Sequence, residues 1–403
     1  MDTVRASTRS EAPRQQTRTI PLSEPFLNGN EWTYVKTCLD SGWVSSAGPI
    51  VSRFEEAVAS YVGAPEAVAT ASGTAALHLA LQLAGVQPDE EVLVSDLTFI
   101  APVNAIRYVG AWPVFMDAEP RTWQMDADKV EGFLREECRV RGGRCYHRRT
   151  RRRVRAILPV HILGLACAMD RLVDLARRYR LVVIEDAAEG MGVRYRGRHV
   201  GTFGKAGILS FNGNKIMTAA GGGMLITSDR ALARRARYLS TQAKDDPVEH
   251  VHAAVGYNYR LSGVQAAIGL AQLEQLEPFI ARKAGIAARY RTALDGVREL
   301  TLMPAPADVR ATYWLFTVLL PEGTTVARRK QLIGALHEQG IGARPFWHPM
   351  HQLKLFRGCQ AFAIDTSPRL YARGVSLPSS VSLTDVDVDR CARTVLRVLE
   401  TRR

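Results

Sequence analysis

The sequence predicts an α/β fold, with a large domain on a mainly parallel sheet and a smaller C-terminal α+β domain. With 403 residues the chain is long enough for two domains, each with its own core. From about residue 21 to 276, short apolar runs alternate with helix-like segments, which is typical of a parallel sheet covered by helices on both faces. We therefore predict a disordered arm at 1–19, a large domain at 20–280 and a small domain at 281–403.

The elements of the large domain follow from apolar spacing. Apolar residues at helical spacing predict helices at Glu31–Asp40 and Phe54–Tyr61, and an Ala- and Leu-rich segment predicts a third at Thr74–Leu83. Short apolar runs predict the strands Glu91–Ser95, Trp112–Met116, Arg155–Val160, Leu181–Glu185, Ile208–Phe211 and Met224–Thr227. The segments between them include the expected helices Lys129–Glu136 and Asp170–Tyr179.

The rest of the chain is expected to be richer in helices than in strands. Long helical patterns run from Ser262 towards Leu276 and from Phe279 towards Leu294. Beyond them we expect a strand at Tyr313–Leu320 and helices at Ala327–Gln339 and Val386–Glu400. Such a mixture predicts a separate α+β domain rather than a continuation of the parallel sheet.

Composition excludes several classes of protein. No apolar run has the length of a membrane span, and residues 1–19 are polar, without the apolar segment of a secretory signal. We therefore expect a cytoplasmic protein with no membrane partner. The six cysteines lack the spacing of a disulfide framework and are expected to be reduced thiols. They are Cys38, Cys138, Cys145, Cys167, Cys359 and Cys391.

The formal charge of +13 is concentrated in one basic insertion, residues 138–155. Nine arginines and no acidic residue lie between Arg139 and Arg155. A DNA-binding protein would combine such charge with a recognition helix or a zinc module, and neither is visible, so we expect no nucleic acid partner. Cys138, Cys145 and His147 lack the number and spacing of a zinc site, so we expect no metal. The insertion is either a solvated arginine-rich hairpin or an element that holds a phosphate-bearing substrate or a neighbouring subunit.

Three segments carry residues that fit a ligand site at the carboxyl ends of parallel strands. In the first, Ser72-Gly73-Thr74, glycine allows close approach of an anion to backbone amides, and the helix start attracts negative charge. An ordinary serine helix cap would explain the same residues. In the second, the apolar strand ending at Glu185-Asp186 delivers two acids. A buried aspartate beside a pyridine nitrogen would keep that nitrogen protonated, although two acids capping the next turn are an alternative.

The third segment places a lysine, Lys215, between two expected strands, close to Ser210 and to the run Gly221–Gly223. Such a lysine can reach a cofactor aldehyde while the serine hydroxyl reaches the cofactor's phosphate. Partial burial would lower the pKa of its amine and make it both a nucleophile and a proton carrier. Taken alone, a lysine is more often a solvated surface residue, so the interpretation depends on the three segments together.

Together these segments resemble the nucleotide-sugar aminotransferases of the DegT/StrS family, which belong to the fold-type I enzymes that depend on pyridoxal 5'-phosphate. The resemblance extends from about Pro21 to the C-terminus. Its most specific motifs are SGTAAL, DLTFIAP, PVHILG, IEDAAEGMG, SFNGNKIMTAAGGGM, GYNYRLSGVQAAIGLAQL and GARPFWHPMHQL. The resemblance implies a large domain with a mainly parallel seven-stranded sheet and an enzyme of the transaminase class.

The resemblance assigns the cofactor contacts residue by residue. Lys215 matches the lysine that forms a Schiff base with pyridoxal 5'-phosphate, and Asp186 matches the partner of the pyridinium nitrogen; these are the two implied catalytic residues. Gly73 and Thr74 match the phosphate-binding helix start, and Ser210 adds its hydroxyl.

Three further positions complete the implied cofactor site. Phe99 matches the aromatic residue that stacks on one face of the ring, and Glu189 matches a variable position against the other face. Asn258 matches a residue that reaches the phosphate of the neighbouring subunit's cofactor. The resemblance therefore implies a homodimer whose active sites are shared between two chains.

Three other positions are implied to contact the substrates, and one residue near the cofactor lysine differs from the family pattern. His161, Arg344 and His351 match positions near the sugar or the incoming amino acid. Ala220 stands where relatives usually have glycine, so the turn after Lys215 is expected to differ slightly.

The resemblance can be narrowed to a subgroup. The opening residues 21–55, the basic insertion and RPFWHPMHQL look most like the LegC subgroup, whose members aminate C4 of a UDP-linked 4-keto-2-acetamido sugar. The GDP-perosamine synthases are similar, and 3-keto-sugar aminotransferases are a further alternative. In each case the resemblance implies L-glutamate as donor and a place in cell-surface glycan or secondary-metabolite sugar biosynthesis.

Two other functions remain to be weighed against this one. Sugar dehydratases share the scaffold but carry histidine at the position of Lys215, which argues against a lyase. A regulator that binds DNA through the arginines would need a DNA-binding module that the sequence does not show.

Overall fold

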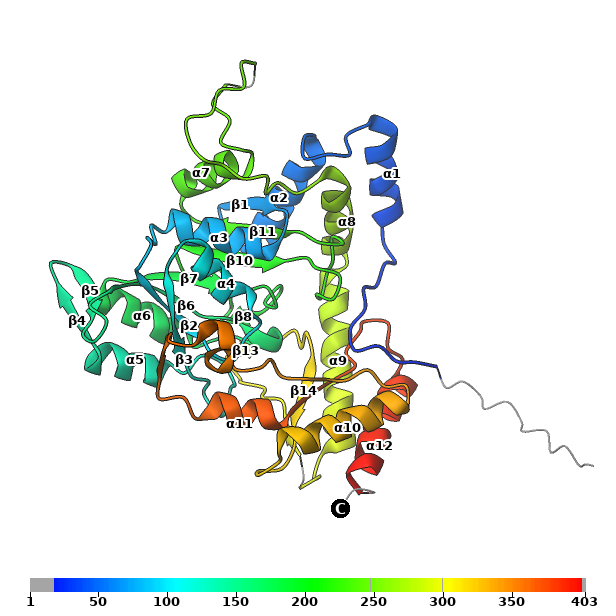
Figure 1. Cartoon of the computed structure of the whole chain (residues 1–403). Helices are drawn as coiled ribbons and strands as arrows, with labels where there is room; N and C mark the ends of the chain where they lie inside the picture. Colours follow the sequence, from blue (N-terminus) through cyan, green and yellow to red (C-terminus); the bar gives the residue numbers. More distant parts are fainter. Residues whose placement is uncertain (1–17, 247, 299, 401–403) are drawn as a thin grey trace, which may run out of the picture.

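The computed structural model describes residues 18–246, 248–298 and 300–400, and these form a mixed α/β molecule (Figure 1). Of the predicted arm 1–19, only residues 18 and 19 are described, and the rest lies outside the described residues. The carbonyl oxygen of Arg18 accepts a hydrogen bond from Arg390, 2.6 Å away, in the C-terminal helix. No helix in the described ranges is long and apolar enough to cross a membrane.

The main sheet is mostly parallel, as predicted. Its path runs β1 (Glu66–Thr70), β11 (Gly223–Thr227), β10 (Ala206–Ser210), β7 (Val182–Asp186), β6 (Arg153–Leu158), β2 (Glu91–Ser95), β3 (Trp112–Met116) and β16 (Gln360–Phe362). Within this path β11 is antiparallel to both neighbours, and the other pairings are parallel. The strands from β1 to β3 are the seven that the resemblance implies. β16 and a hairpin, β4 (Cys138–Arg141) and β5 (Arg144–His147), extend the sheet to ten.

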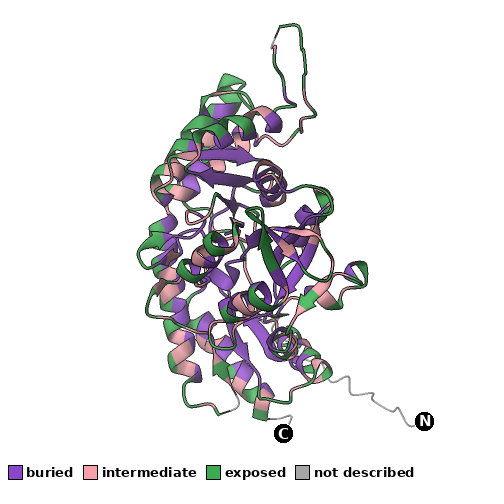
Figure 2. Ribbon diagram, turned by 90° about the vertical axis from the view of Figure 1, so that its left-hand side faces the viewer, coloured by how far each residue is buried: buried purple, intermediate pink, exposed green. Residues whose placement is uncertain are grey.

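Helices cover both faces of this sheet because successive residues of its strands are apolar and point to opposite sides. In β2, Val92 and Val94 belong to one core cluster, and Leu93 belongs to the other. The first cluster includes residues of α3 (Gly73–Leu83), α4 (Ala101–Tyr108) and α7 (Arg230–Ser240). The second includes residues of α2 (Pro49–Val62), α5 (Ala127–Glu136), α6 (Met169–Tyr179) and α8 (Gly263–Glu274). Figure 2 shows the buried strands between these partly exposed helices.

The C-terminal part contains a second sheet, which is antiparallel. Its order is β12 (Thr301–Leu302), β14 (Phe316–Leu319), β17 (Gly374–Leu377) and β15 (Arg344–Pro345). Around it lie α9 (Leu276–Leu294), α10 (Val326–Glu338), α11 (Thr366–Arg373) and α12 (Asp385–Glu400). A small third sheet joins β13 (Val309–Arg310) to β8 (Arg194–Tyr195) and β9 (Arg198–His199). The remaining helix, α1 (Glu31–Ser41), packs against α8.

Two strands from the C-terminal part pair with the rest of the molecule. β16 joins β3 of the main sheet, and β13 joins β8. Helix α9 also runs through residue 280 without a break. The division into domains at 280 and 281 remains a prediction.

Candidate active site

A cavity of about 720 Å³ lies at the carboxyl ends of the parallel strands, where ligands of such sheets are expected. Its walls combine the loops that follow β7 and β10, the start of α3, and residues 344–347 of the C-terminal part. Eight of the predicted site residues line it: Gly73, Thr74, Phe99, Asp186, Glu189, Ser210, Lys215 and Arg344. Residues far apart in the sequence are thus brought into one enclosure.

One wall of the cavity is the N-terminus of α3. The Ser72 hydroxyl accepts a hydrogen bond from the Ala75 amide at 3.0 Å, so the serine is a helix cap, as the simpler interpretation expected. The cap leaves room for an anion as well, since Gly73 and Thr74 line the cavity next to it. A Cβ on Gly73 would lie 3.2 Å from the Cβ of Ser210. Glycine therefore lets the hydroxyl of Ser210 lie beside the helix start, where an anion is stabilised.

The two acids at the end of β7 face opposite sides of the sheet and have different environments. Glu185 is fully buried, and its carboxylate accepts hydrogen bonds from the amides of Gly201, Phe203 and Gly204, at 2.6–2.7 Å. These bonds make Glu185 a structural residue. Asp186 faces the cavity, and its Oδ1 accepts one bond, from the Ala188 amide at 3.0 Å. It therefore also caps the turn that follows the strand, as the alternative proposed.

Asp186 lies in a setting that favours a cationic ligand. Burial raises the pKa of the Asp186 carboxyl, and the nearby Lys215 and His161 act in the opposite direction. A buried carboxylate is stabilised when a cation lies against it, so a protonated ring nitrogen would lower this pKa. That environment fits the pyridinium nitrogen of pyridoxal phosphate.

Lys215 is not a solvated surface lysine. Its side chain is only 14% exposed, and its Nζ lies 3.3 Å from Oε1 of Glu189. The same nitrogen lies 4.1 Å from the ring centre of Trp314. Glu189 is itself buried, and its Oε2 accepts a bond from the Leu163 amide at 2.8 Å. Burial raises the pKa of the Glu189 carboxyl, while Lys215 lowers it.

Two tryptophans in the wall were not identified from the sequence. The Trp314 indole N–H donates to the carbonyl oxygen of Asn214 at 2.6 Å, next to Lys215 in the chain. Its ring stacks on that of Trp347, with 6.3 Å between centres and 10° between planes. Both tryptophans lie in aromatic-rich segments, TYWLF and RPFW, that also read as ordinary core. Only their convergence at the cavity distinguishes them from core residues.

Three predicted residues lie outside the cavity lining. His161 is fully buried, where its Nδ1 accepts from the Cys167 amide at 3.1 Å and its Nε2 lies 3.1 Å from Glu185. Its amide donates to the carbonyl oxygen of Asp186, so it supports the backbone of that residue. Asn258 is exposed, on the segment that follows α7. Their predicted roles near ligands, and that of His351, remain predictions.

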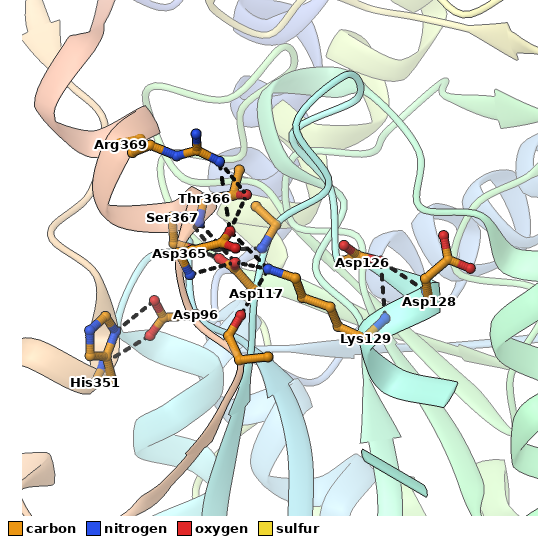
Figure 3. Close-up of polar contacts among 12 residues, drawn as sticks. Asp96, Asp117, Asp126, Asp128, Lys129, His351, Asp365, Thr366, Ser367 and Arg369 are labelled. Carbon is orange, nitrogen blue, oxygen red and sulfur yellow. Dashed lines mark hydrogen bonds and ion pairs between the residues drawn. The ribbon is translucent and has the colours of Figure 1, made fainter. Parts of the chain in front are cut away.

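Acidic residues at the ends of β2 and β3 hold the C-terminal part against the cavity (Figure 3). Asp96 accepts hydrogen bonds from the amide and from Nδ1 of His351, each at 2.8 Å. Asp117 accepts from the amides of residues 365–367, at 2.8–2.9 Å, and lies 2.5 Å from Nζ of Lys129. These contacts anchor the segment that follows Arg344, so they help to keep that arginine at the cavity wall.

The turn after Lys215 has the conformation that glycine favours, but with alanine in it. Ala220 has φ +60°, in the left-handed region, and its amide donates to the hydroxyl of Thr218 at 2.9 Å. Its neighbour Gly222 has φ +94°, and a Cβ there would lie 2.5 Å from Leu261. The alanine therefore carries backbone strain that glycine would avoid.

The arrangement fits the phosphate, the ring nitrogen and the aldehyde of pyridoxal phosphate. A helix start with an adjacent hydroxyl suits the phosphate, a buried carboxylate suits the ring nitrogen, and a sheltered amine suits the aldehyde. Phe99, 57% exposed, offers a free aromatic face within the cavity. The Thr98 hydroxyl beside it is buried and has no hydrogen-bond partner among the described residues, so it is available to a ligand.

Comparison with known proteins agrees with this geometry. The model of the DegT/DnrJ/EryC1/StrS aminotransferase family matches residues 26–396. A GDP-perosamine synthase of Caulobacter vibrioides is 38% identical over 97% of this chain and 100% of its own length. One from Escherichia coli O157:H7 is also 38% identical, over 92% of this chain and 95% of its own.

A solved structure shares the fold. The aminotransferase TlmJ from Streptoalloteichus hindustanus superposes with a TM-score of 0.86 at 28% identity, covering 95% of this chain and 99% of its own. Enzymes of the matched family depend on pyridoxal phosphate, as the site here would require. The chain therefore belongs to the DegT/DnrJ/EryC1/StrS aminotransferase family, and it is a pyridoxal-phosphate-dependent aminotransferase, an enzyme of the transferase class.

Proposed function

We propose that the chain is a sugar aminotransferase that moves the amino group of L-glutamate to the C4 keto group of a nucleotide-linked sugar. The observation that carries the proposal is the convergence of Lys215, Asp186 and the start of α3 on one cavity of about 720 Å³. Relatives that align over nearly the whole chain are named as synthases of a nucleotide-linked amino sugar. We further propose a cytoplasmic place, in cell-surface glycan or secondary-metabolite sugar biosynthesis.

Each cavity residue has one proposed task. Lys215 would hold the cofactor covalently through Nζ, and Gly73, Thr74 and Ser210 would hold its phosphate. Asp186 would keep the ring nitrogen protonated. When bound, pyridoxal phosphate supplies the electron sink that makes the C–H bond at the donor's Cα breakable.

The environment of Lys215 suits a residue that carries protons. Its Nζ would be the group that takes the proton from Cα of the donor and holds it. Glu189 lies 3.3 Å from this amine, and Trp314, which stacks on Trp347, covers it at 4.1 Å from the ring centre. The exposed guanidinium of Arg344 in the same wall is suited to a carboxylate or a diphosphate.

Two nucleotide sugars are candidates for the acceptor. The relatives' names favour a GDP-linked 4-keto sugar, and the opening motif with the basic insertion favours a UDP-linked 4-keto-2-acetamido sugar. Incubating the holoenzyme with L-glutamate and each sugar, together with a 3-keto isomer, and identifying the amino sugar by mass spectrometry and NMR decides between them. Absence of an amino sugar from the entire panel would contradict a nucleotide-sugar substrate.

The role of Lys215 can be tested separately from the sugar. Lys215→Ala should abolish the formation of 2-oxoglutarate from glutamate, and borohydride should then leave no cofactor adduct at residue 215. Lys215→Arg is the matched control, because it keeps the positive charge beside Glu189 but cannot form the same link. Full turnover in either variant would refute the assignment.

We also propose that two chains share each active site. Large apolar side chains are exposed around α1 and on the segment after α7, including Trp32 at 77% and Val255 at 81%. That segment projects from the body of the molecule at the top of Figure 1. Exposed apolar surface of this kind is typical of an interface, and Asn258 lies on the same segment.

Complementation between two inactive variants tests the sharing directly. If Asn258 of one chain serves the cofactor held by Lys215 of the other, a hybrid of Lys215→Ala and Asn258→Ala chains has one intact site. Refolding an equal mixture should then recover roughly a quarter of the wild-type activity, since half of the dimers are hybrids with one working site each. A mixture no more active than the separate variants would place both residues in the same chain's site.

A further inference from the structure

The arginine-rich hairpin β4–β5 forms a second concavity, of about 510 Å³, that the aminotransferase chemistry does not use. It is lined by Arg139, Arg141, Arg144 and Arg151, with Tyr146 and His147. Strand β6 begins beside the hairpin, where Val154 pairs with Cys145, and the chain reaches the active-site cavity only at Val160. The hairpin thus lies at the amino end of β6, at the left of Figure 1, and its concavity is distinct from the active site.

The hairpin is a well-packed scaffold. Its two-residue turn, Gly142-Gly143, has φ of +56° and +70°, the left-handed pair that a tight hairpin turn requires. Cys138, Cys145 and His147 on the inner face are buried, with Nδ1 of His147 2.8 Å from the Glu91 carboxylate and its ring 5.2 Å from that of Phe133. Packing of the inner face fixes the backbone of the hairpin, so the side chains of the outer face project from fixed positions.

The arginines on the outer face repel one another, which destabilises the hairpin. Arg141 is directly opposite Arg144, and like charges in that position destabilise a strand pair. Arg139 lies on the same face, and the left-handed Arg151 turns the chain back beside it. Burial lowers the pKa of the adjacent Arg155, and Arg153 and Arg144 lower it further, while Glu90 acts in the opposite direction.

The four lining arginines are exposed, and their guanidinium groups have no ion-pair or hydrogen-bond partner in the part of the chain that the structure describes. By contrast, Arg177 and Arg178 on the nearby helix α6 are paired with Asp174 and Glu131. Unpaired guanidiniums held around one concavity are complementary to a compact anion with several adjacent charges. Each can donate two parallel N–H bonds to a phosphate group.

We propose that this concavity is a binding site for the diphosphate group of a small molecule. Its volume lies within the range of small-molecule sites, roughly 300–1,000 Å³. The diphosphate could belong to a nucleoside diphosphate or be free inorganic pyrophosphate. Tyr146 in the lining offers a ring against which a nucleoside base can stack.

Chemical modification of arginine tests the site in the holoenzyme without reference to activity. Phenylglyoxal reacts with exposed guanidiniums, and mass spectrometry locates each adduct. Saturating pyrophosphate should slow modification of the four lining arginines at least about fivefold, since charge-assisted bonds shield the guanidiniums. Modification of Arg177 and Arg178 should not change. An accompanying change at Arg344 reports the active site separately.

The matched variants are Arg141→Gln/Arg144→Gln and the control Arg177→Gln/Arg178→Gln, which remove equal charge. The first pair relieves the cross-strand repulsion, so the hairpin should stay folded, which circular dichroism checks. The Arg141→Gln/Arg144→Gln pair should raise, at least about tenfold, the pyrophosphate concentration that halves the modification rate of Arg139 and Arg151. The control pair should leave that concentration unchanged. Stronger protection by UDP or GDP than by pyrophosphate identifies a nucleotide as the source, and equal protection identifies the free anion.

Three results would overturn the proposal. The first is no protection by any diphosphate, and the second is equal protection by inorganic phosphate at the same concentration. The third is protection by duplex DNA but not by pyrophosphate, which would make the hairpin an extended polyanion surface. The proposed transamination could fail while this test succeeds, or the reverse, because the readout is local to the hairpin.

Discussion

Asp117 connects the two parts of the chain, and its replacement by asparagine should be severely destabilising. Its Oδ2 accepts from the amides of Asp365 and Thr366 and from Lys129, and its Oδ1 accepts from the amide and the hydroxyl of Ser367. The three amides belong to the start of α11, whose first N–H groups have no acceptor within the helix (Figure 3). A carboxylate from the main sheet thus caps a helix of the C-terminal part.

The magnitude follows from the number of bonds. Asparagine keeps one oxygen, which can serve the three donors on Oδ2, but its NH₂ then faces the two donors of Ser367. Two bonds to a buried charged group are lost, at about 1.5–3 kcal/mol each, so the free energy of unfolding should fall by about 3–6 kcal/mol. Asp128→Asn is the control, since Asp128 is 78% exposed and pairs with Arg171 at the surface, where ion pairs contribute about 0–1 kcal/mol.

The assay is urea unfolding followed by far-ultraviolet circular dichroism, with both variants compared with wild type. The penalty should also be the same at pH 7.5 and pH 5. Burial alone would raise the pKa of Asp117, but its N–H and O–H donors outweigh burial and hold the pKa well below its ordinary value. A lowered carboxyl pKa stabilises the fold above the ordinary value of about 3.9, and that stabilisation is lost as pH falls through the lowered value. A penalty below about 1 kcal/mol, or one equal to that of Asp128→Asn, would refute the capping role.

Two further predictions concern the neighbourhood of the cavity. Ala220→Gly should raise the free energy of unfolding by about 0.5–1 kcal/mol in urea titration. Relief of the left-handed strain exceeds the cost of the added flexibility of the unfolded chain, and no packing is lost at this exposed position. A lower free energy of unfolding in the variant would contradict this prediction. Asp96 raises the pKa of His351 by its hydrogen bond, against the effect of burial. The ionic contribution is therefore complete below the unfolded pKa of about 6.5 and is lost as pH rises through the raised value. His351→Gln should cost about 1.5 kcal/mol more at pH 6 than at pH 9 in the same titration, and an equal cost at both would show that the pair carries no charge.

Local patterns in the sequence located six strands of the main sheet but missed β1 and the hairpin strands β4 and β5. The strands Glu91–Ser95 and Trp112–Met116 have the predicted bounds, because β-branched and apolar residues there end at polar or turn residues. The amphipathic helices α5 and α6 were also located, since one apolar face at helical spacing is a local property, but α7 was missed. The family motifs determined the fold class and pointed to the residues that now line the cavity.

Short elements stabilised by distant partners could not be predicted. β16 exists because Gln360–Phe362 pairs with β3, more than two hundred residues earlier, and no local pattern reports that pairing. The predicted strand from Tyr313 begins only at Phe316, because Tyr313 has a positive φ of 48°. Helix α4 was missed because, with 8 residues, it is too short for its apolar spacing to establish a helical period.

The sequence by itself determined which residue types are present for the chemistry: a lysine, two acids and a glycine-rich helix start. Only the tertiary structure decided where each acid faces, because strand alternation turns Glu185 into a network of amides and Asp186 towards the cavity. The tertiary structure also places Trp314 against Lys215 and stacks Trp347 on Trp314. His161 lies outside the cavity lining. Side-chain direction and burial depend on contacts between segments far apart in the chain, and those contacts form only when the whole chain folds.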